Sequence, residues 1–441
     1  MAILRDPMLR NGHALIVSAA SSQIIGVAFW VVAARSYPAA MVGRNSAAIS
    51  VTTFLAGIAE LNLMSTLVRF LPTSGRRSAR FILTVYAASA AIAMVLGAGF
   101  LLLIPQIEPQ LDFLRSSPAM ATWFAVSVVT GAIFVLQDSA LTGVRAAPFV
   151  PVENIAFSLV KLGIMFPIVR LVPGSGIYVA WTLGFLLAVI PTNGYLFGRA
   201  IPRHVRTRPA TGPPPRLRNI QSYLIPDSVA AMFFMASTSL LPLLIIRRLG
   251  AAAAAHYSLA WLMGYALYLV SLNMGSSLVV ETADDQDRLR ARCVRALTHL
   301  GKLVVPVVIL VVVAAPYLLL VFGRGYARAD VGALRLLALS AIPALVTNLA
   351  VSVTRSQRRM AVVVGIQLSI CALVWGLASV LMGPLGITGV GAAWFIAQSA
   401  VAAVLLVWPG LWVPAKRLPR HAVAETAEPP ASPEPAGQAG R

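Results

Sequence analysis

The chain of 441 residues is 58% hydrophobic and only 11% charged, whereas soluble proteins are about 25% charged. Composition therefore excludes a soluble globular protein, which could not bury so much apolar surface. The formal net charge of +20 does not indicate nucleic-acid binding, because the basic residues lie in short segments between long apolar runs.

Long apolar runs predict about twelve transmembrane helices. Each run is close to the roughly 20 residues that span a bilayer. The runs are continuous and not alternating, which favours helices over the strands of a barrel. The first run is too long for the apolar core of a secretory signal, so we expect it to be retained. The fold class is therefore an all-α polytopic membrane protein, with runs at 14–34, 45–68, 80–104, 120–140, 154–172, 177–197, 223–246, 255–279, 299–322, 331–353, 360–382 and 386–411.

An Arg- and Pro-rich segment near the middle of the chain divides these runs into two sets of six. We predict an N-terminal six-helix lobe at 1–198, a basic connector at 199–222, a C-terminal six-helix lobe at 223–413 and a tail at 414–441. The tail is rich in Pro, Ala and Glu and cannot bury apolar area, so we expect it to be disordered. Lys and Arg are concentrated in the loops at 69–80, 141–153, 281–298 and 354–359, so these loops, the connector, the tail and both termini are predicted to be cytoplasmic.

Two octets at equivalent places in the two sets match each other. Residues 61–68 read LNLMSTLV and residues 272–279 read LNMGSSLV, and upstream Arg35 corresponds to Arg247. The match predicts two pseudo-symmetric lobes in parallel orientation. Such repeats are typical of carriers that hold their substrate between the halves.

Ionisable side chains inside apolar runs are costly and usually face a cavity or a partner. A cationic cavity between the lobes could hold an anionic head group such as a diphosphate, because guanidinium groups bind such anions in bidentate fashion. The arginines at helix ends could equally extend to lipid phosphates. The candidates for substrate binding are Arg35, Arg69, Lys161, Arg247 and Arg248.

Carboxylates in or near the runs are candidates for ion coupling: Glu60, Asp138 and Asp227. Asp138 and Asp227 could instead cap the ends of helices. Three amides, Asn62, Asn154 and Asn273, are predicted to line the polar cavity.

Motifs for common catalytic chemistry are missing from the sequence. The only Gly-Lys pair, Gly301-Lys302, is followed by Leu303, so there is no P-loop. The five histidines are scattered without metal-ligand spacing, and we expect neither a metal nor a cofactor. No predicted external loop is long enough to carry catalytic groups. The sequence therefore predicts a protein that is not an enzyme.

Two stretches carry a resemblance to a known family. Residues 61–72, LNLMSTLVRFLP, and residues 136–162, LQDSALTGVRAAPFVPVENIAFSLVKL, resemble the multidrug/oligosaccharidyl-lipid/polysaccharide (MOP) flippase superfamily. The second stretch is similar in particular to the Wzx-type polysaccharide-export branch. The order of residues that carries this resemblance is Asp138, Thr142-Gly143, Arg145, Pro148, Asn154 and Lys161.

The resemblance implies a MATE-like, V-shaped bundle that moves polyprenyl-diphosphate-linked oligosaccharide across the bacterial cytoplasmic membrane, coupled to an ion gradient. It implies as partners the lipid-linked oligosaccharide, membrane lipids and polysaccharide polymerase or export machinery, and no nucleic acid. The chain has fewer predicted spans than lipid II flippases. Two alternatives stay open: a MATE-like drug/cation antiporter, and a polyprenol-dependent glycosyltransferase or polymerase.

Overall fold

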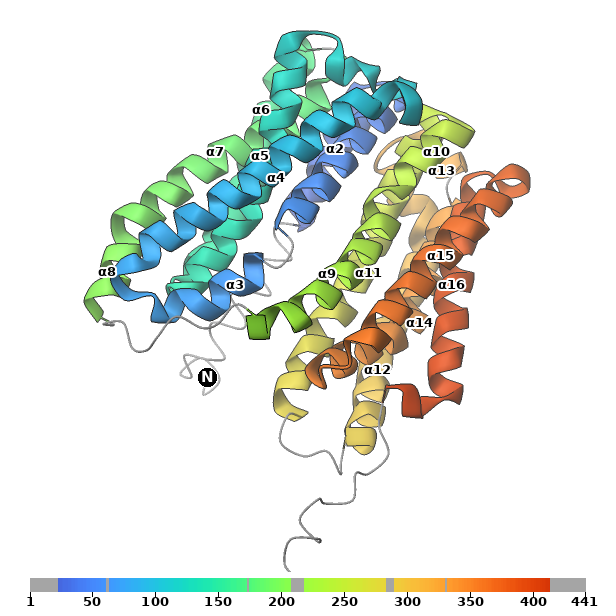
Figure 1. Ribbon diagram of the computed structural model, residues 1–441. Helices are drawn as coiled ribbons and strands as arrows, with labels where there is room; N and C mark the ends of the chain where they lie inside the picture. The colour runs from blue at the N-terminus through green and yellow to red at the C-terminus, as the bar shows by residue number, and fades with distance from the viewer. Residues whose placement is uncertain are drawn as a thin grey trace, which may run out of the picture.

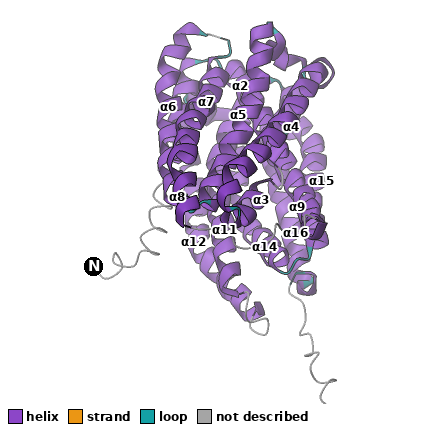
Figure 2. Cartoon of the chain, turned by 60° about the vertical axis from the view of Figure 1, so that its left-hand side comes forward, coloured by secondary structure: helices purple, strands orange, loops and turns teal. Residues whose placement is uncertain are grey.

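The computed structural model describes residues 23–60, 63–172, 174–207, 218–282, 289–329 and 331–412. All regular elements in these ranges are helical (Figure 2). The first helix in the described residues is Gln23–Ser36. The helices that follow are α2 (Ala39–Glu60), α3 (Leu63–Phe70), α4 (Ser78–Ile107), α5 (Pro118–Gly143), α6 (Val150–Leu171), α7 (Gly176–Tyr195), α8 (Ile201–Thr207), α9 (Arg218–Ser239), α10 (Leu241–Leu249), α11 (Ala251–Thr282), α12 (Leu289–Leu320), α13 (Arg324–Ala329), α14 (Val331–Ser356), α15 (Met360–Leu385) and α16 (Ile387–Val407).

The helices form a membrane-spanning bundle. Within the described ranges, nine helices are long and apolar enough to cross a membrane, or ten if α2 and α3, inclined by 47° to each other, form one broken span. Their outer surfaces carry large apolar side chains exposed to the surroundings, such as Leu102 on α4 and Leu310 on α12. Such exposure is unfavourable in water over so many helices and is expected in lipid.

Each of the twelve predicted runs overlaps with one or two helices in the described residues. Ten of the runs correspond to the nine spans and the broken pair of α2 and α3. The other two runs are 14–34 and 255–279. The structure describes the helix Gln23–Ser36 for the first, and the second lies within the 32-residue helix α11. The run at 223–246 is divided into α9 and α10 at Leu240. The predicted all-α polytopic class is confirmed.

Figure 1 shows the helices up to α8 on one side of the molecule and those from α9 onward on the other. The two groups meet where α2 packs against α11. There the Ser46 and Ser258 hydroxyls lie 3.1 Å apart, and Gly43 lies against the backbone of Ala251. Ser46 and Ser258 are 212 positions apart, as are Arg35 and Arg247.

The division into two lobes with a connector at 199–222 and a tail at 414–441 stays a prediction. Helix α8 continues to Thr207 and α9 begins at Arg218, so helix covers both ends of the predicted connector. Residues 208–217 and the tail lie outside the described residues. The helices α3 and α8 and the start of α9 lie at one end of the bundle, whereas α10 and α13 lie at the other (Figure 1).

Candidate functional site

A polar network is buried where α5 ends and α6 begins. The Glu153 side chain, 4% exposed, accepts a hydrogen bond from the Gln137 amide nitrogen. Gln137 Oε1 in turn accepts from Asn193 Nδ2 on α7 at 2.8 Å. One residue beyond Gln137, Asp138 Oδ2 accepts from Asn154 Nδ2 at 3.4 Å. Three helices therefore contribute to one network of amides and carboxylates.

Three carboxyl groups lie in this region. Asp138 and Glu153 interact directly through their side chains, and Glu60 at the end of α2 lies close enough to Asp138 to interact with it electrostatically. We name Glu60, Asp138 and Glu153 with their amide partners Gln137, Asn154 and Asn193 the carboxylate network. The turn between α5 and α6 joins Asp138 and Glu153, and the end of α2 brings Glu60 beside them.

The carboxylate network is short of hydrogen-bond donors. One oxygen on each carboxylate, Glu60 Oε2, Asp138 Oδ1 and Glu153 Oε2, is buried without a donor among the described residues. Because two carboxylates in contact repel each other when both are charged, a proton or a monovalent cation held between them would satisfy both. No group of three or more His, Cys, Asp or Glu side chains in the described ranges has the arrangement of a metal site.

Lys161, on the middle of α6, is a second buried charged group. It is 4% exposed, and its amine lies 3.9 Å from the ring centre of Trp181, 4.6 Å from that of Phe157 and 5.8 Å from that of Phe29. Aromatic faces attract cations. Among the described residues no carboxylate forms an ion pair with Lys161. The helices Gln23–Ser36, α6 and α7 thus form an aromatic cage around a single cation.

The five predicted cationic residues do not come together. Lys161 is buried within the N-terminal helices, whereas the four arginines are exposed at helix ends. Arg35 donates to Val321 O at 3.0 Å, and the Arg69 guanidinium lies 5.8 Å from the Phe70 ring centre. Arg69 is on α3, at the opposite end of the bundle from Arg247 and Arg248 at the end of α10 (Figure 1).

Arg247 has an acidic neighbour outside the membrane-spanning segments. Glu108 follows α4 and caps the helical turn Pro109–Arg115 by accepting from the Gln110 N–H at 3.3 Å. Burial raises the pKa of Glu108, while the Gln110 hydrogen bond and the charge of Arg247 oppose that shift. Arg247, a predicted substrate-binding residue, therefore interacts electrostatically with a carboxylate of the protein itself, Glu108.

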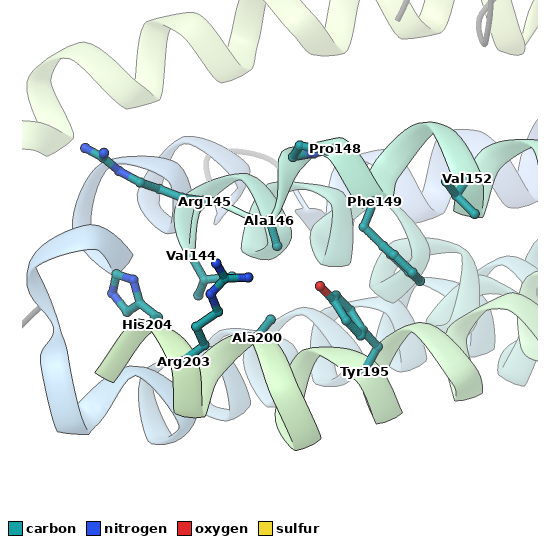
Figure 3. A pocket seen from close by; sticks show the side chains of 10 residues that line it. All are labelled: Val144, Arg145, Ala146, Pro148, Phe149, Val152, Tyr195, Ala200, Arg203 and His204. Carbon is teal, nitrogen blue, oxygen red and sulfur yellow. The ribbon is translucent and has the colours of Figure 1, made fainter. Parts of the chain in front are cut away.

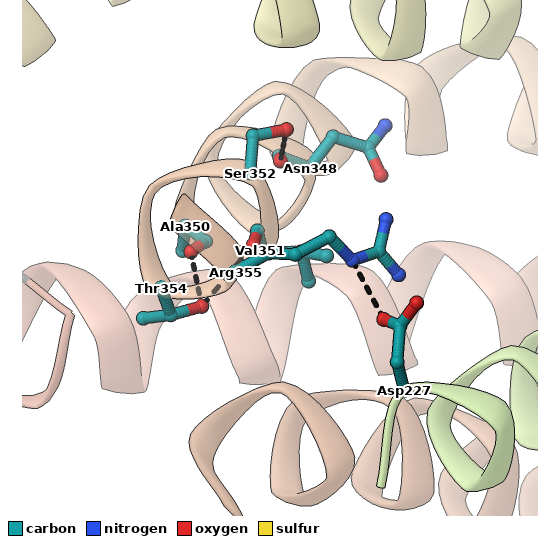
Figure 4. Close-up of polar contacts among 7 residues, drawn as sticks. All are labelled: Asp227, Asn348, Ala350, Val351, Ser352, Thr354 and Arg355. Carbon is teal, nitrogen blue, oxygen red and sulfur yellow. Dashed lines mark hydrogen bonds and ion pairs between the residues drawn. The ribbon is translucent and has the colours of Figure 1, made fainter. Parts of the chain in front are cut away.

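Asp227, the third predicted coupling residue, is paired with a cation. Its carboxylate lies 2.8 Å from Arg355 Nε at the end of α14, and both side chains are partly exposed (Figure 4). Asp227 thus belongs to an ion pair between α9 and α14, away from the carboxylate network. Asn62 and the side chain of Asn273 lie outside the described residues.

Sequence reasoning missed Glu153, which it placed in a cytoplasmic loop. The sequence signal was the (i, i+15) spacing of Asp138 and Glu153 across a short turn, which places both residues near the same level of adjacent antiparallel helices. In the described residues the buried Asp, Glu and Lys side chains are Glu108, Glu153 and Lys161, all before residue 208. The buried polar side chains after residue 217 are neutral, for example Thr347, which donates to Gln398 at 2.9 Å.

Comparisons with known proteins identify the fold. No family model and no curated protein matches the chain. A solved structure described as the inward-facing conformation of a multidrug resistance MATE family transporter of the MOP superfamily superposes with a TM-score of 0.69 at 16% identity, covering 88% of this chain and 93% of the other. The outward-facing conformation of such a transporter gives 0.60 at 14% identity over 91% and 94%. The lipid II flippase MurJ, inward closed, gives 0.66 at 13% identity over 89% and 86%.

These similarities extend over most of each chain, and the similar structures are transporters or flippases, not enzymes. The MATE-like fold that the resemblance implied is confirmed. This chain is a multi-pass membrane protein with the fold of MOP-superfamily transporters.

Proposed function

We propose that the chain is a flippase that moves polyprenyl-diphosphate-linked oligosaccharide across the bacterial cytoplasmic membrane by alternating access, coupled to an ion gradient. The observation that carries the proposal is the placement of the buried charges. Lys161 and the carboxylate network both lie in the N-terminal helices, while the described C-terminal helices hold neutral buried polar groups. One half of the carrier thus contains both a fixed cation and an exchangeable-ion site.

Lys161 favours an anionic substrate. A buried amine without a carboxylate partner would repel a cationic drug and attract a diphosphate once water or the head group reaches it. The aromatic rings of Phe157 and Trp181 around it offer apolar faces on which sugar rings can pack. MurJ, a solved structure with a similar fold, is described as a lipid II flippase.

The carboxylate network supplies the coupling in this proposal. Glu153 and Asp138 exchange a proton or monovalent cation, and their charge state changes the packing of α5 and α6. Of the predicted coupling residues, Glu60 and Asp138 keep that role, Glu153 joins them, and Asp227 becomes a structural partner of Arg355. The protein lies with both termini in the cytoplasm and delivers its cargo to polysaccharide polymerase or export machinery.

The test is a deletion strain assayed for lipid-linked sugar. We expect the sugar to accumulate on the cytoplasmic leaflet and surface polysaccharide to disappear. Lys161→Ala and Glu153→Gln should reproduce this loss at normal protein level. Glu108→Gln, a buried carboxylate outside the network, is the matched control and should restore export. Normal export with Lys161→Ala would contradict the proposal.

A second candidate function is a drug/cation antiporter. The observation that favours it is the carboxylate network itself, because Glu60, Asp138 and Glu153 attract cations. Changed susceptibility to cationic drugs in the deletion strain, with normal lipid-linked sugar, would favour this candidate. Unchanged susceptibility with accumulated sugar favours the flippase. A Glu60→Gln change should alter the pH or ion dependence of transport in either case.

A further inference from the structure

A cavity opens at the end of the N-terminal helices, between the α5–α6 turn and the junction of α7 with α8. Its volume is about 620 Å³, within the roughly 300–1,000 Å³ of small-ligand pockets. We name it the α5–α8 pocket. It is lined by Val144, Arg145, Ala146, Pro148, Phe149, Val152, Tyr195, Ala200, Arg203 and His204 (Figure 3).

The polar groups of the α5–α8 pocket suit an anion. Arg145, Arg203 and the buried His204 line it, and none of its lining residues is acidic. The Arg203 guanidinium and the Tyr195 hydroxyl point into the same space (Figure 3). The Tyr195 ring is held by stacking on Phe149, with ring centres 4.3 Å apart. A guanidinium beside a fixed hydroxyl offers several donors to the oxygens of a phosphate group.

The backbone at Arg145, which lines the pocket, has a strained conformation. Arg145 has φ 63°, in the left-handed region that favours glycine. The Arg145 N–H donates to Thr142 O at 3.0 Å and the Ala146 N–H to Leu141 O at 2.7 Å, which is a Schellman ending of α5.

The same ending occurs after α14 in the C-terminal helices. Arg358, φ 58°, follows α14, and the Arg359 N–H donates to Thr354 O at 2.9 Å. Arg358 is exposed and does not line the α5–α8 pocket. The chain thus provides a control in which an arginine has the same backbone strain and a different surrounding.

An apolar track leads from the pocket along the outside of α6. Val152 lies at the pocket, and Leu159 and Phe166 follow at seven-residue intervals on the same face of the helix. These three side chains are 58%, 53% and 61% exposed. A ligand with a phosphate in the pocket and an acyl chain on this track would match both surfaces, whereas a soluble anion would use only the first.

We propose that the α5–α8 pocket binds the phosphate headgroup of an anionic phospholipid, with Arg203 contacting the phosphate, Arg145 adding positive charge at the rim and the acyl chain lying along α6. This lipid is distinct from the transported substrate, and neither Lys161 nor any residue of the carboxylate network lines its pocket. A phospholipid headgroup and free phosphate both present a phosphate anion, so the experiment must distinguish between these two ligands.

The test uses the full-length protein in nanodiscs of phosphatidylcholine, with and without phosphatidylglycerol. Thermal unfolding and native mass spectrometry measure stabilisation by the anionic lipid and its retention. We expect Arg203→Gln to weaken phosphatidylglycerol binding by roughly ten- to a hundredfold, the loss of charge-assisted hydrogen bonds. Arg206→Gln, an exposed arginine one turn further on α8 that does not line the pocket, should bind as wild type.

A second pair of variants separates lipid binding from folding. Arg145→Gly and Arg358→Gly each remove the backbone strain of an arginine with positive φ. Both substitutions should therefore raise the unfolding temperature in the absence of anionic lipid. Only Arg145→Gly should lose stabilisation by phosphatidylglycerol. Equal lipid stabilisation of wild type, Arg203→Gln and Arg145→Gly would overturn the proposal. Inorganic phosphate that stabilises the protein in phosphatidylcholine as well as phosphatidylglycerol does would overturn the assignment to a lipid.

Discussion

The contact of α2 with α11 predicts the effect of a single methyl group. A Cβ atom added at Gly43 would lie 1.7 Å from Ala251 O and 2.9 Å from Ala255 N. Both are backbone atoms, so no side chain can rotate away. Real Cβ atoms stay beyond 3.0 Å of such neighbours, and the two helices must therefore separate by about 1 Å in Gly43→Ala.

Overpacking of this kind typically costs about 1–3 kcal/mol. The cost falls on the conformation in which α2 and α11 are in contact, because a state with these helices apart is not affected. If the carrier alternates between the two, the contact state becomes roughly 5- to 150-fold less populated relative to the other. Transport should slow because one of the two states is depleted.

Cross-linking measures this population directly. The Ser46 and Ser258 hydroxyls lie 3.1 Å apart across the same contact, so cysteines at these positions should form a disulfide rapidly in a background without Cys293 and Cys371. Adding Gly43→Ala should slow cross-linking at least about fivefold, in line with the population shift.

The matched control is Gly163→Ala. Gly163 lies in the middle of α6, and a Cβ atom there meets nothing within 4 Å. This variant should gain the helix propensity of alanine, about 1 kcal/mol, and cross-link as the parent does. Unchanged cross-linking in Gly43→Ala would refute the reasoning, because it would show that α2 and α11 accommodate the methyl group without separating.

Three further predictions concern charged groups. The Lys161→Met variant should unfold at or above the wild-type temperature, because the substitution removes a buried charge and keeps the volume of the side chain. Its transport rate should fall more than about tenfold. Thermal unfolding and transport assays of the same preparation measure both effects. A double-mutant cycle with Asp227→Asn and Arg355→Gln should give a coupling energy of about 0.2–1 kcal/mol in unfolding experiments, because the ion pair is partly exposed. A larger coupling energy would mean that the pair is shielded from solvent. Burial raises the pKa of Glu108 above the ordinary 4.5, so the contribution of this group to stability is greatest below pH 4.5 and is lost as the pH rises through the raised pKa. Glu108→Gln should remove this part of the pH dependence of the unfolding temperature, and an unchanged profile would contradict the prediction.

Sequence by itself determined the fold class and the places of the helices. Apolar runs of bilayer length have no stable alternative to helix in lipid, because each backbone amide must find its partner within the segment. For this reason the predicted runs coincide with helices even where local detail differs, as at Leu240 between α9 and α10. The resemblance at 61–72 and 136–162 implied a MATE-like fold, and the solved structures of similar fold agree with it.

Only the tertiary structure decided which polar side chains meet. Sequence placed Lys161 at depth, but the aromatic cage of Phe29, Phe157 and Trp181 requires helices from three parts of the chain. Likewise the interactions of Asp138 with Glu60 and with Glu153, and the pairing of Asp227 with Arg355, depend on helix rotation. Rotation is set by packing of apolar faces against neighbours, and a helix apolar on all sides, such as α5 or α6, carries almost no signal of which face is turned inward.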